Sequence, residues 1–208
     1  MLNEVTEAFF SRSAELVGGE VGEAMRRVVA DPSDAAAVAL LATEPGYNSR
    51  LRTTCVATLL DGGHASNALP QLATANVNCR ILPDHDADDV HRRLQALATP
   101  FDVAVEPAGE ARPSPPSPLT DDVLGPIERI TEQMWPGVKV LPVMSTGATD
   151  ALYLRREGIP VYGVSGLFRD MDDNRAHGQD ERIAVSAFYE GMEFLYRLVR
   201  ALSGGGIA

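Results

Sequence analysis

The sequence has 208 residues, of which 45% are hydrophobic and 23% are charged, and its formal net charge is −11. That length and apolar content can bury the core of one medium domain or of two small ones. The acidic balance, without any run of Lys or Arg longer than two residues, argues against nucleic acid or an anionic membrane surface as a partner. No apolar stretch reaches the roughly 18 residues that a membrane span needs.

The first 45 residues predict helices. Segments rich in Ala, Glu, Leu and Met, which favour helix, run over residues 4–17, 20–30 and 33–43. They are separated by Gly18-Gly19 and by Asp31-Pro32, which break helices. The N-terminus lacks the basic start and the apolar run of a secretory signal.

Two β-strands are predicted next, over residues 51–60 and 73–82. The first is rich in β-branched residues and ends at the turn signal of residues 61–63. The second alternates strictly, with one apolar face and one polar face. The apolar face comprises Ala73, Ala75, Val77, Cys79 and Ile81, and the polar face comprises Thr74, Asn76, Asn78 and Arg80. Such a strand packs one side on a core and presents its polar side to something else.

Each predicted strand contains one of the two cysteines, Cys55 and Cys79. With so few cysteines, buried thiols in a reducing compartment are the preferred interpretation over a disulfide framework. A cytoplasmic location is therefore the expectation.

A helix and a further strand follow. Asp86 is a predicted N-cap, and the amphipathic pattern after it turns Val90, Leu94 and Leu97 inward. Residues 101–105 predict a short strand. The order strand, strand, helix, strand matches the second part of a split β-α-β unit.

Residues 111–118 hold four prolines in six positions, which predicts a semi-rigid linker. The expected division is a first part over residues 1–111 with the N-terminal helices and the partial β-α-β pattern, a linker over 112–118 and a second α/β part over 119–208. In this second part, helix and strand signals alternate. They predict a helix capped by Thr120, a strand over 138–143, a helix over 150–157, a strand over 159–164 and a helix over 184–202.

Two of the four histidines are candidate functional residues. His177 lies in a carboxylate-rich loop, residues 168–181, just after a predicted core strand, where open α/β sheets place their ligand sites. A neutral imidazole there could bind zinc while a nearby acid orients its second nitrogen, and the alternative is a solvated polar loop. His64 follows a Gly-Gly turn, and its position allows two interpretations. It is either a structural turn residue or a residue that contacts a ligand. His85 and His91 lie in or beside an acidic helix and are read as structural.

The segment Ser145–Asp150 also follows a predicted strand and precedes a helix. Its backbone N–H groups and hydroxyls could hold a carboxylate or carbonyl oxygen, and the alternative is an ordinary helix cap by Thr149 or Asp150. A serine hydrolase using Ser145, Asp150 and His177 is disfavoured, because no Gly-x-Ser-x-Gly elbow is present.

Taken together, four segments resemble the dinuclear-zinc metallopeptidase and deacylase family that includes aminoacylase, acetylornithine deacetylase and succinyl-diaminopimelate desuccinylase. They are residues 63–70 (GHASNALP), 78–83 (NCRILP), 145–150 (STGATD) and 176–181 (AHGQDE). The resemblance implies an α/β catalytic domain with two bridged zinc ions and a smaller β-α-β-β-α-β lid that mediates dimerisation. On this basis residues 1–111 are expected to form a partial lid or dimerisation domain, and residues 119–208 the C-terminal part of the catalytic domain. It also implies that Asn67 and Arg80 reach the substrate, that His177 is the last metal ligand, and that Thr146, Gly147 and Asp150 line the substrate pocket.

The resemblance does not extend to the family's other metal ligands, its general base or the first strand of its lid. We therefore expect the C-terminal portion of a zinc-dependent amide hydrolase of peptides or N-acyl amino acids, with an incomplete metal site and a homodimeric lid. Arg80, whose planar fork suits a carboxylate, is grouped with Asn67 and His64 as the candidate catalytic residues. The alternative is a non-catalytic dimerisation or binding module.

Overall fold

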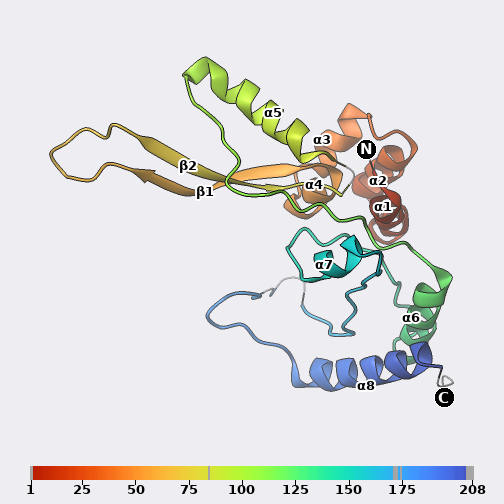
Figure 1. Cartoon of the computed structure of the whole chain (residues 1–208). Helices are drawn as coiled ribbons and strands as arrows, with labels where there is room; N and C mark the ends of the chain where they lie inside the picture. The colour runs from red at the N-terminus through yellow and green to blue at the C-terminus, as the bar shows by residue number, and fades with distance from the viewer. Residues whose placement is uncertain (1, 84, 171–172, 174, 205–208) are drawn as a thin grey trace. The chain divides into compact units, whose positions relative to one another are not determined.

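The structure is a computed structural model that describes residues 2–83, 85–170, 173 and 175–204. It combines helices with a two-stranded sheet (Figure 1), which confirms a mixed α/β class at that level. The chain divides into two compact units. The first unit comprises Met1–Ser117 and Pro142–Pro160, and the second comprises Pro118–Leu141 and Val161–Ala208.

The first unit begins with four helices, α1 (Glu4–Val17), α2 (Gly19–Ala30), α3 (Ala35–Leu41) and α4 (Pro45–Leu51). The first three confirm the predicted helices. Their core is formed by side chains from all three, including the fully buried Phe10, Met25, Val28 and Leu41. Helix α4 was not predicted, because its sequence, PGYNSRL, lacks an apolar period, and it starts through Pro45 at its first turn and the Glu44 side chain.

Capping by side chains explains where these helices start. Asn3 and Thr6 form a capping box, in which each side chain accepts a hydrogen bond from the backbone N–H of the other, at 3.0 and 2.9 Å. Asp34 accepts hydrogen bonds from the N–H groups of Ala36 and Ala37 and a bidentate pair from Arg27. These bonds favour the carboxylate, so the pKa of Asp34 is lowered, chiefly by Ala37 and then by Arg27.

An antiparallel hairpin follows, made of β1 (Thr54–Gly62) and β2 (Ala73–Arg80). Both predicted strands are confirmed, although β1 continues into the predicted turn. A register shift between Ala57 and Leu59 leaves Thr58 as a bulge, where it accepts a hydrogen bond from Asn76 Nδ2 at 2.8 Å.

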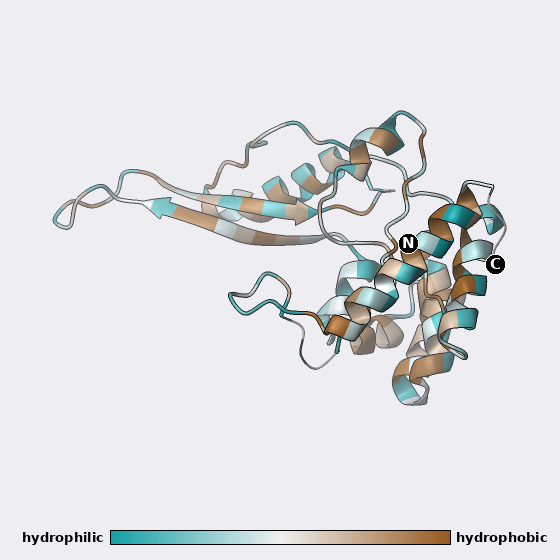
Figure 2. Cartoon of the chain, turned by 90° about the horizontal axis from the view of Figure 1, so that it is seen from below, coloured by the Kyte–Doolittle hydropathy of each residue, from teal (hydrophilic) through white to brown (hydrophobic). Residues whose placement is uncertain are grey.

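The prediction that one face of β2 packs on a core was wrong. Figure 2 shows hydrophobic positions in brown along the hairpin, and they are accessible, with Leu60 79% and Val77 44% exposed. A sheet of two strands buries a face only where another layer covers it. The alternation of apolar and polar residues in β2 indicates that one face can be buried, but it does not indicate which part of the structure covers that face.

Helix α5 (Ala87–Ala98) is confirmed, and Asp86 caps it by accepting a hydrogen bond from Asp88 N at 2.9 Å. The helix runs into a 3-10 turn, η1 (Thr99–Phe101). The strand predicted over residues 101–105 was wrong. Side chains of α5 take the place of a neighbouring strand, since Gln95 Oε1 accepts from Val105 N and His91 Nε2 lies 3.0 Å from Val105 O. The complete split β-α-β unit is thus not seen among the described residues.

The second unit is organised by α6 (Asp121–Met134) and α8 (Val185–Leu202), and both helices were predicted. Thr120 occupies the N-cap position of α6, but its side chain accepts no capping hydrogen bond there, which differs from the prediction. Ile127 and Ile130 of α6 pack with Phe194 and Leu198 of α8. No helix in the described part of the chain is long and apolar enough to cross a membrane.

Of the three elements predicted between α6 and α8, the helix is present among the described residues and the two strands are not. The short helix α7 (Ala151–Arg156), in the first unit, confirms the predicted one. The strands predicted over 138–143 and 159–164 were wrong, because neither segment joins a hydrogen-bonded ladder in the described part of the chain, where the sheet consists of β1 and β2. The outer face of α8 also stays apolar and exposed, at Phe188, Met192, Leu195, Val199 and Leu202.

Candidate functional site

His64 and Asn67 lie in the exposed loop between the two strands, residues 63–72. Figure 1 shows this loop at the far end of the hairpin from α4. His64 lines a shallow hollow of about 270 Å³ together with Asp61, Gln71 and Thr74. The tip therefore presents an imidazole and an amide to solvent, which suits contacts with a carbonyl oxygen.

Arg80 lies at the other end of the hairpin, as the last residue of β2, and pairs with Thr54. Its side chain is exposed, and within the described residues it makes no hydrogen bond or ion pair. Asn78 precedes it on the same face and brings no negative charge. Within the described part of the chain Arg80 is thus an unpaired cation, and its guanidinium can donate two parallel hydrogen bonds to an anionic ligand.

The hairpin keeps these candidates apart. From Ala73 to Arg80 there are seven residue steps, which at about 3.4 Å each place the base roughly 24 Å from the start of the tip loop. A single hairpin does not bring Arg80 to the same small ligand as His64 and Asn67.

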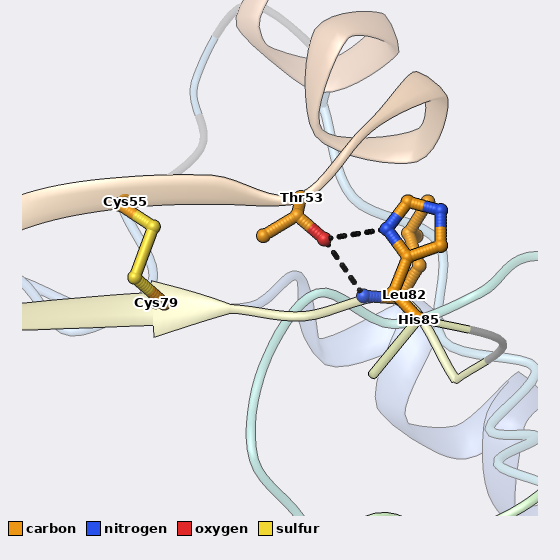
Figure 3. Close-up of a disulfide and its surroundings, with 5 residues drawn as sticks. All are labelled: Thr53, Cys55, Cys79, Leu82 and His85. Atoms are coloured by element: carbon orange, nitrogen blue, oxygen red, sulfur yellow. Dashed lines mark hydrogen bonds between the residues drawn. A yellow bond between two sulfur atoms is a disulfide. The ribbon is translucent and has the colours of Figure 1, made fainter. Parts of the chain in front are cut away.

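The two cysteines lie directly beside Arg80 and form a disulfide (Figure 3), with their Cα atoms 4.1 Å apart. The prediction of buried free thiols was wrong on both counts, because Cys55 is exposed and Cys79 only half-buried. The number of cysteines carries no information about strand register, and register makes Cys55 and Cys79 direct partners.

Thr53 forms a second link at this end of the hairpin. Its Oγ1 accepts a hydrogen bond from Leu82 N at 3.3 Å and lies 3.0 Å from His85 Nδ1 (Figure 3). Sequence reasoning missed Thr53, since a threonine before a strand has no distinguishing signal. It read His85 as structural and gave it no partner.

The loop Ser145–Asp150 is exposed and irregular. Ser145 Oγ accepts a hydrogen bond from Gly147 N at 3.2 Å, and Thr149 Oγ1 accepts one from Ala151 N at 3.4 Å. Asp150 takes the N-cap position of α7 without a capping hydrogen bond from its side chain. Its carboxylate and the Thr146 hydroxyl are therefore accessible, as a pocket-lining role requires.

His177 occupies the third position of a turn closed by Gly178 N donating to Arg175 O at 2.9 Å. Its φ is +64°, in the left-handed region that few non-glycine residues adopt. The imidazole is exposed and lies in the second unit, whereas the other candidate residues lie in the first. Residues 171–172 and 174 of this acidic loop lie outside the described residues.

Two carboxylates of the loop that contains His177, those of Asp173 and Asp180, are already paired with arginines. Asp173 accepts hydrogen bonds from Arg182 Nη2 at 2.7 Å and from Arg175 Nε at 2.5 Å, and Arg175 also contacts Asp180. The pKa of Asp173 is lowered, first by the bond from Arg182 and then by that from Arg175. A hollow of about 580 Å³ borders this loop, with Phe168 and Phe188 among its walls, and His177 is not one of its lining residues.

These residues do not fit a complete zinc centre. A catalytic zinc takes about three protein ligands, and no group of three His, Cys, Asp or Glu side chains that could hold a metal occurs among the described residues. Asp173 and Asp180 are occupied by arginines. His177 is a candidate for a single ligand.

Comparison with known proteins gives a consistent match. Residues 8–201 match the sequence model described as Peptidase family M20/M25/M40. N-fatty-acyl-amino acid synthase/hydrolase PM20D1 of Homo sapiens is 28% identical over 160 residues, which cover 75% of this chain and 32% of that protein. Aminoacylase-1 of Homo sapiens is 29% identical over 167 residues, 78% of this chain and 40% of the relative.

A third relative is the probable carboxypeptidase S-like 2 of Dictyostelium discoideum, 23% identical over 163 residues, which cover 77% of this chain and 31% of the relative. The chain thus spans about a third of the length of the first curated relatives that it matches. No solved structure matches the chain significantly.

Proposed function

The chain belongs to peptidase family M20/M25/M40, and from this premise we propose that it provides the C-terminal part of an amide hydrolase. The proposed substrate is a peptide or an N-acyl amino acid, the classes that the relatives' names indicate. The observation on which this rests is the match over residues 8–201, because that span includes every candidate residue.

Arg80 is the proposed anchor for the substrate carboxylate. It is exposed, permanently charged and unpaired within the described residues, and its guanidinium can donate two parallel hydrogen bonds to a carboxylate. Thr146, Gly147 and Asp150 line the substrate pocket in this proposal. Their loop has accessible hydroxyl and carboxylate groups, which supports the assignment.

Asn67 and His64 are the proposed contacts to the scissile carbonyl and its developing negative charge. Since about 24 Å of strand separates the tip loop from Arg80, we propose a homodimer through the hairpin region, in which the tip of one copy and the base of the other contact one substrate. The separation favours this arrangement over a site built from one hairpin.

His177 is the proposed ligand to one zinc ion, and the remaining ligands and the general base are assigned to parts of the enzyme outside this chain. The residues of this chain then bind and orient the substrate, while cleavage of the amide is not assigned to them. An exposed imidazole held by a constrained turn supports this role.

The alternative is a non-catalytic dimerisation or binding module. It is favoured by one observation, the long hairpin with both faces exposed. Such a module would keep the hairpin and hydrolyse nothing, so activity of the full-length enzyme distinguishes the two proposals.

The test combines metal content with turnover. The purified 208-residue chain, after zinc loading and desalting, should hold little zinc by elemental analysis and should not hydrolyse a panel of N-acyl amino acids and dipeptides. In the full-length enzyme, Arg80→Ala should lower kcat/KM by about a hundredfold or more, as expected for a lost bidentate charge contact. His177→Ala should abolish turnover.

Arg93→Ala is the matched control, because Arg93 is an exposed arginine of the same unit, on α5. Turnover by both Arg80→Ala and His177→Ala within a few-fold of wild type would end the proposal. Two bound zinc ions with turnover in the 208-residue chain would overturn the assignment of the missing ligands to other parts of the enzyme.

A further inference from the structure

The base of the hairpin is held by two cross-strand links (Figure 3), and Arg80 lies between them along the chain. The disulfide reaches Cys79, the residue directly before Arg80. The hydrogen bond from Leu82 N to Thr53 Oγ1 lies two residues after it.

The first link is covalent and acts through the strand register. Cys55 and Cys79 are direct partners, and the next pair along the ladder is Thr54 with Arg80. Because side chains alternate along a strand, Arg80 points away from the disulfide while its backbone is tied to it. The disulfide therefore restrains the Cα position of Arg80 without covering its guanidinium.

The second link continues the pairing beyond the last ladder pair. Thr53 Oγ1 accepts a hydrogen bond from Leu82 N at 3.3 Å and can donate one to His85 Nδ1 at 3.0 Å, so one hydroxyl joins the start of β1 to the turn that follows β2. Leu82 is buried, which anchors this end of the hairpin to the first unit. A valine at position 53 would keep the shape and lose both hydrogen bonds.

The rest of the hairpin contrasts with its base. A ribbon of two strands is marginally stable by itself, and here both faces are exposed. Its middle has the bulge at Thr58, whose hydroxyl donates a hydrogen bond to Asn76 O at 3.3 Å and accepts one from Asn76 Nδ2 at 2.8 Å, and its tip is an open loop. The disulfide and the Thr53 hydrogen bonds are thus both located at the base of the hairpin, next to Arg80, the proposed carboxylate anchor.

We propose that the Cys55–Cys79 disulfide and the Thr53 hydroxyl are positioning groups for Arg80, which hold its guanidinium ready for a substrate carboxylate. This inference rests on the proposed function, in which Arg80 binds that carboxylate. It makes substrate capture sensitive to thiols: a dithiol reduces the S–S bond with two electrons and two protons, giving two cysteine thiols and the reagent's own disulfide.

The test uses the 208-residue chain and two readouts. Amide hydrogen exchange measures the links themselves and needs no substrate. Titration with N-acetyl-leucine, followed by the NMR signal of Arg80 Nε, measures carboxylate binding, and N-acetyl-leucinamide is the control ligand without a carboxylate. The variants are Thr53→Val, Thr53→Ser, the double variant Cys55→Ser with Cys79→Ser, and Arg80→Ala. Thr58→Val is the matched control, since it removes a hydrogen bond elsewhere in the same hairpin.

Thr53→Val and the double cysteine variant should speed exchange of the amides of residues 79–82 by about tenfold or more, as expected when local opening becomes easier. They should weaken N-acetyl-leucine binding and leave the response to N-acetyl-leucinamide unchanged. Thr53→Ser should restore both readouts, because it keeps the hydroxyl. Thr58→Val should change neither, and reoxidation of the reduced wild-type chain should recover binding.

Two results separate the inference from the proposed function. In the first result, Thr53→Val and the double cysteine variant leave amide exchange and ligand binding unchanged, while Arg80→Ala loses binding. This result would overturn the positioning role and keep Arg80 as the carboxylate anchor. A wild-type Arg80 signal that does not respond to N-acetyl-leucine would remove Arg80 from the proposed function, and with it the role of both links.

Discussion

The carboxylate of Asp173 accepts a hydrogen bond from Arg182 at 2.7 Å, within four residues of His177 in the acidic loop of the second unit. The arginines of this loop therefore neutralise acids that the sequence pattern offered as partners for the histidine. An acid engaged in this way is a poorer metal ligand, because binding a metal would first require breaking the ion pair.

The titration of Asp173 tests this pairing. Its pKa is lowered by Arg182 and then by Arg175, so a carbon-13 titration of its carboxyl should show a midpoint below the ordinary aspartate value of about 3.9. A lowered pKa means that the pairs stabilise the loop above that ordinary value and are lost as the pH falls through the lowered pKa.

Arg182→Ala should move the midpoint of Asp173 back upward. Arg169→Ala is the control, because Arg169 lies in the same loop and makes no hydrogen bond to Asp173 within the described residues. A midpoint unchanged by Arg182→Ala would show that this ion pair does not form in solution.

At His177, a change to glycine tests the backbone conformation of the turn and the role of the imidazole separately. With φ at +64°, a non-glycine residue costs roughly 1–2 kcal/mol relative to glycine. His177→Gly should therefore protect the Gly178 amide, which donates to Arg175 O, better than the wild type does in hydrogen exchange. In the full-length enzyme the same change should abolish turnover, as should His177→Ala. Turnover retained by the glycine variant would rule out the proposed ligand role.

Two helical glycines of the second unit should respond oppositely to alanine. At Gly191 of α8 an added Cβ would overlap the side chain of Leu167 and lie 3.2 Å from Ser165 O. Overpacking costs about 1–3 kcal/mol, which outweighs the gain of roughly 1 kcal/mol in helix propensity. At Gly125 of α6 the nearest atom is the flexible end of Arg129 at 3.1 Å, so the propensity gain should dominate.

Trp135, the single tryptophan, reports on this unit because its ring lies 5.6 Å from that of Phe194. Urea unfolding followed by its fluorescence should give a lower midpoint for Gly191→Ala and a higher one for Gly125→Ala. Equal shifts in both variants would contradict the packing between α8 and Leu167.

The disulfide makes a chemical prediction. The unreduced chain should take up no iodoacetamide, and the chain reduced under denaturing conditions should take up two groups by mass spectrometry. Cys55→Ser should expose one reactive thiol at Cys79. Two alkylated cysteines in the unreduced chain would restore the free-thiol interpretation. Because the bond links residues 24 positions apart, its loss should cost about 3 kcal/mol through the entropy of the unfolded chain.

Local signals in the sequence were sufficient for most helices and for the two strands that form the hairpin. The side chains of Asn3, Asp34 and Asp86 accept hydrogen bonds from backbone amides within three positions of themselves. The position at which each of these helices begins therefore depends on adjacent residues of the sequence. The two strands of the hairpin follow from their period of two. The family could also be predicted from the sequence, because the four segments that resemble it keep their order and spacing. The match over residues 8–201 confirms the family.

Only the tertiary structure decided the features that depend on pairing between distant residues. The Cys55–Cys79 bond follows from register, and the segment at residues 103–105 bonds to α5 side chains in place of a strand. The exposed faces of β2 and α8 have the same physical basis. A hydrophobic pattern shows that burial is favourable, and which surface is buried depends on the layers that the rest of the chain supplies.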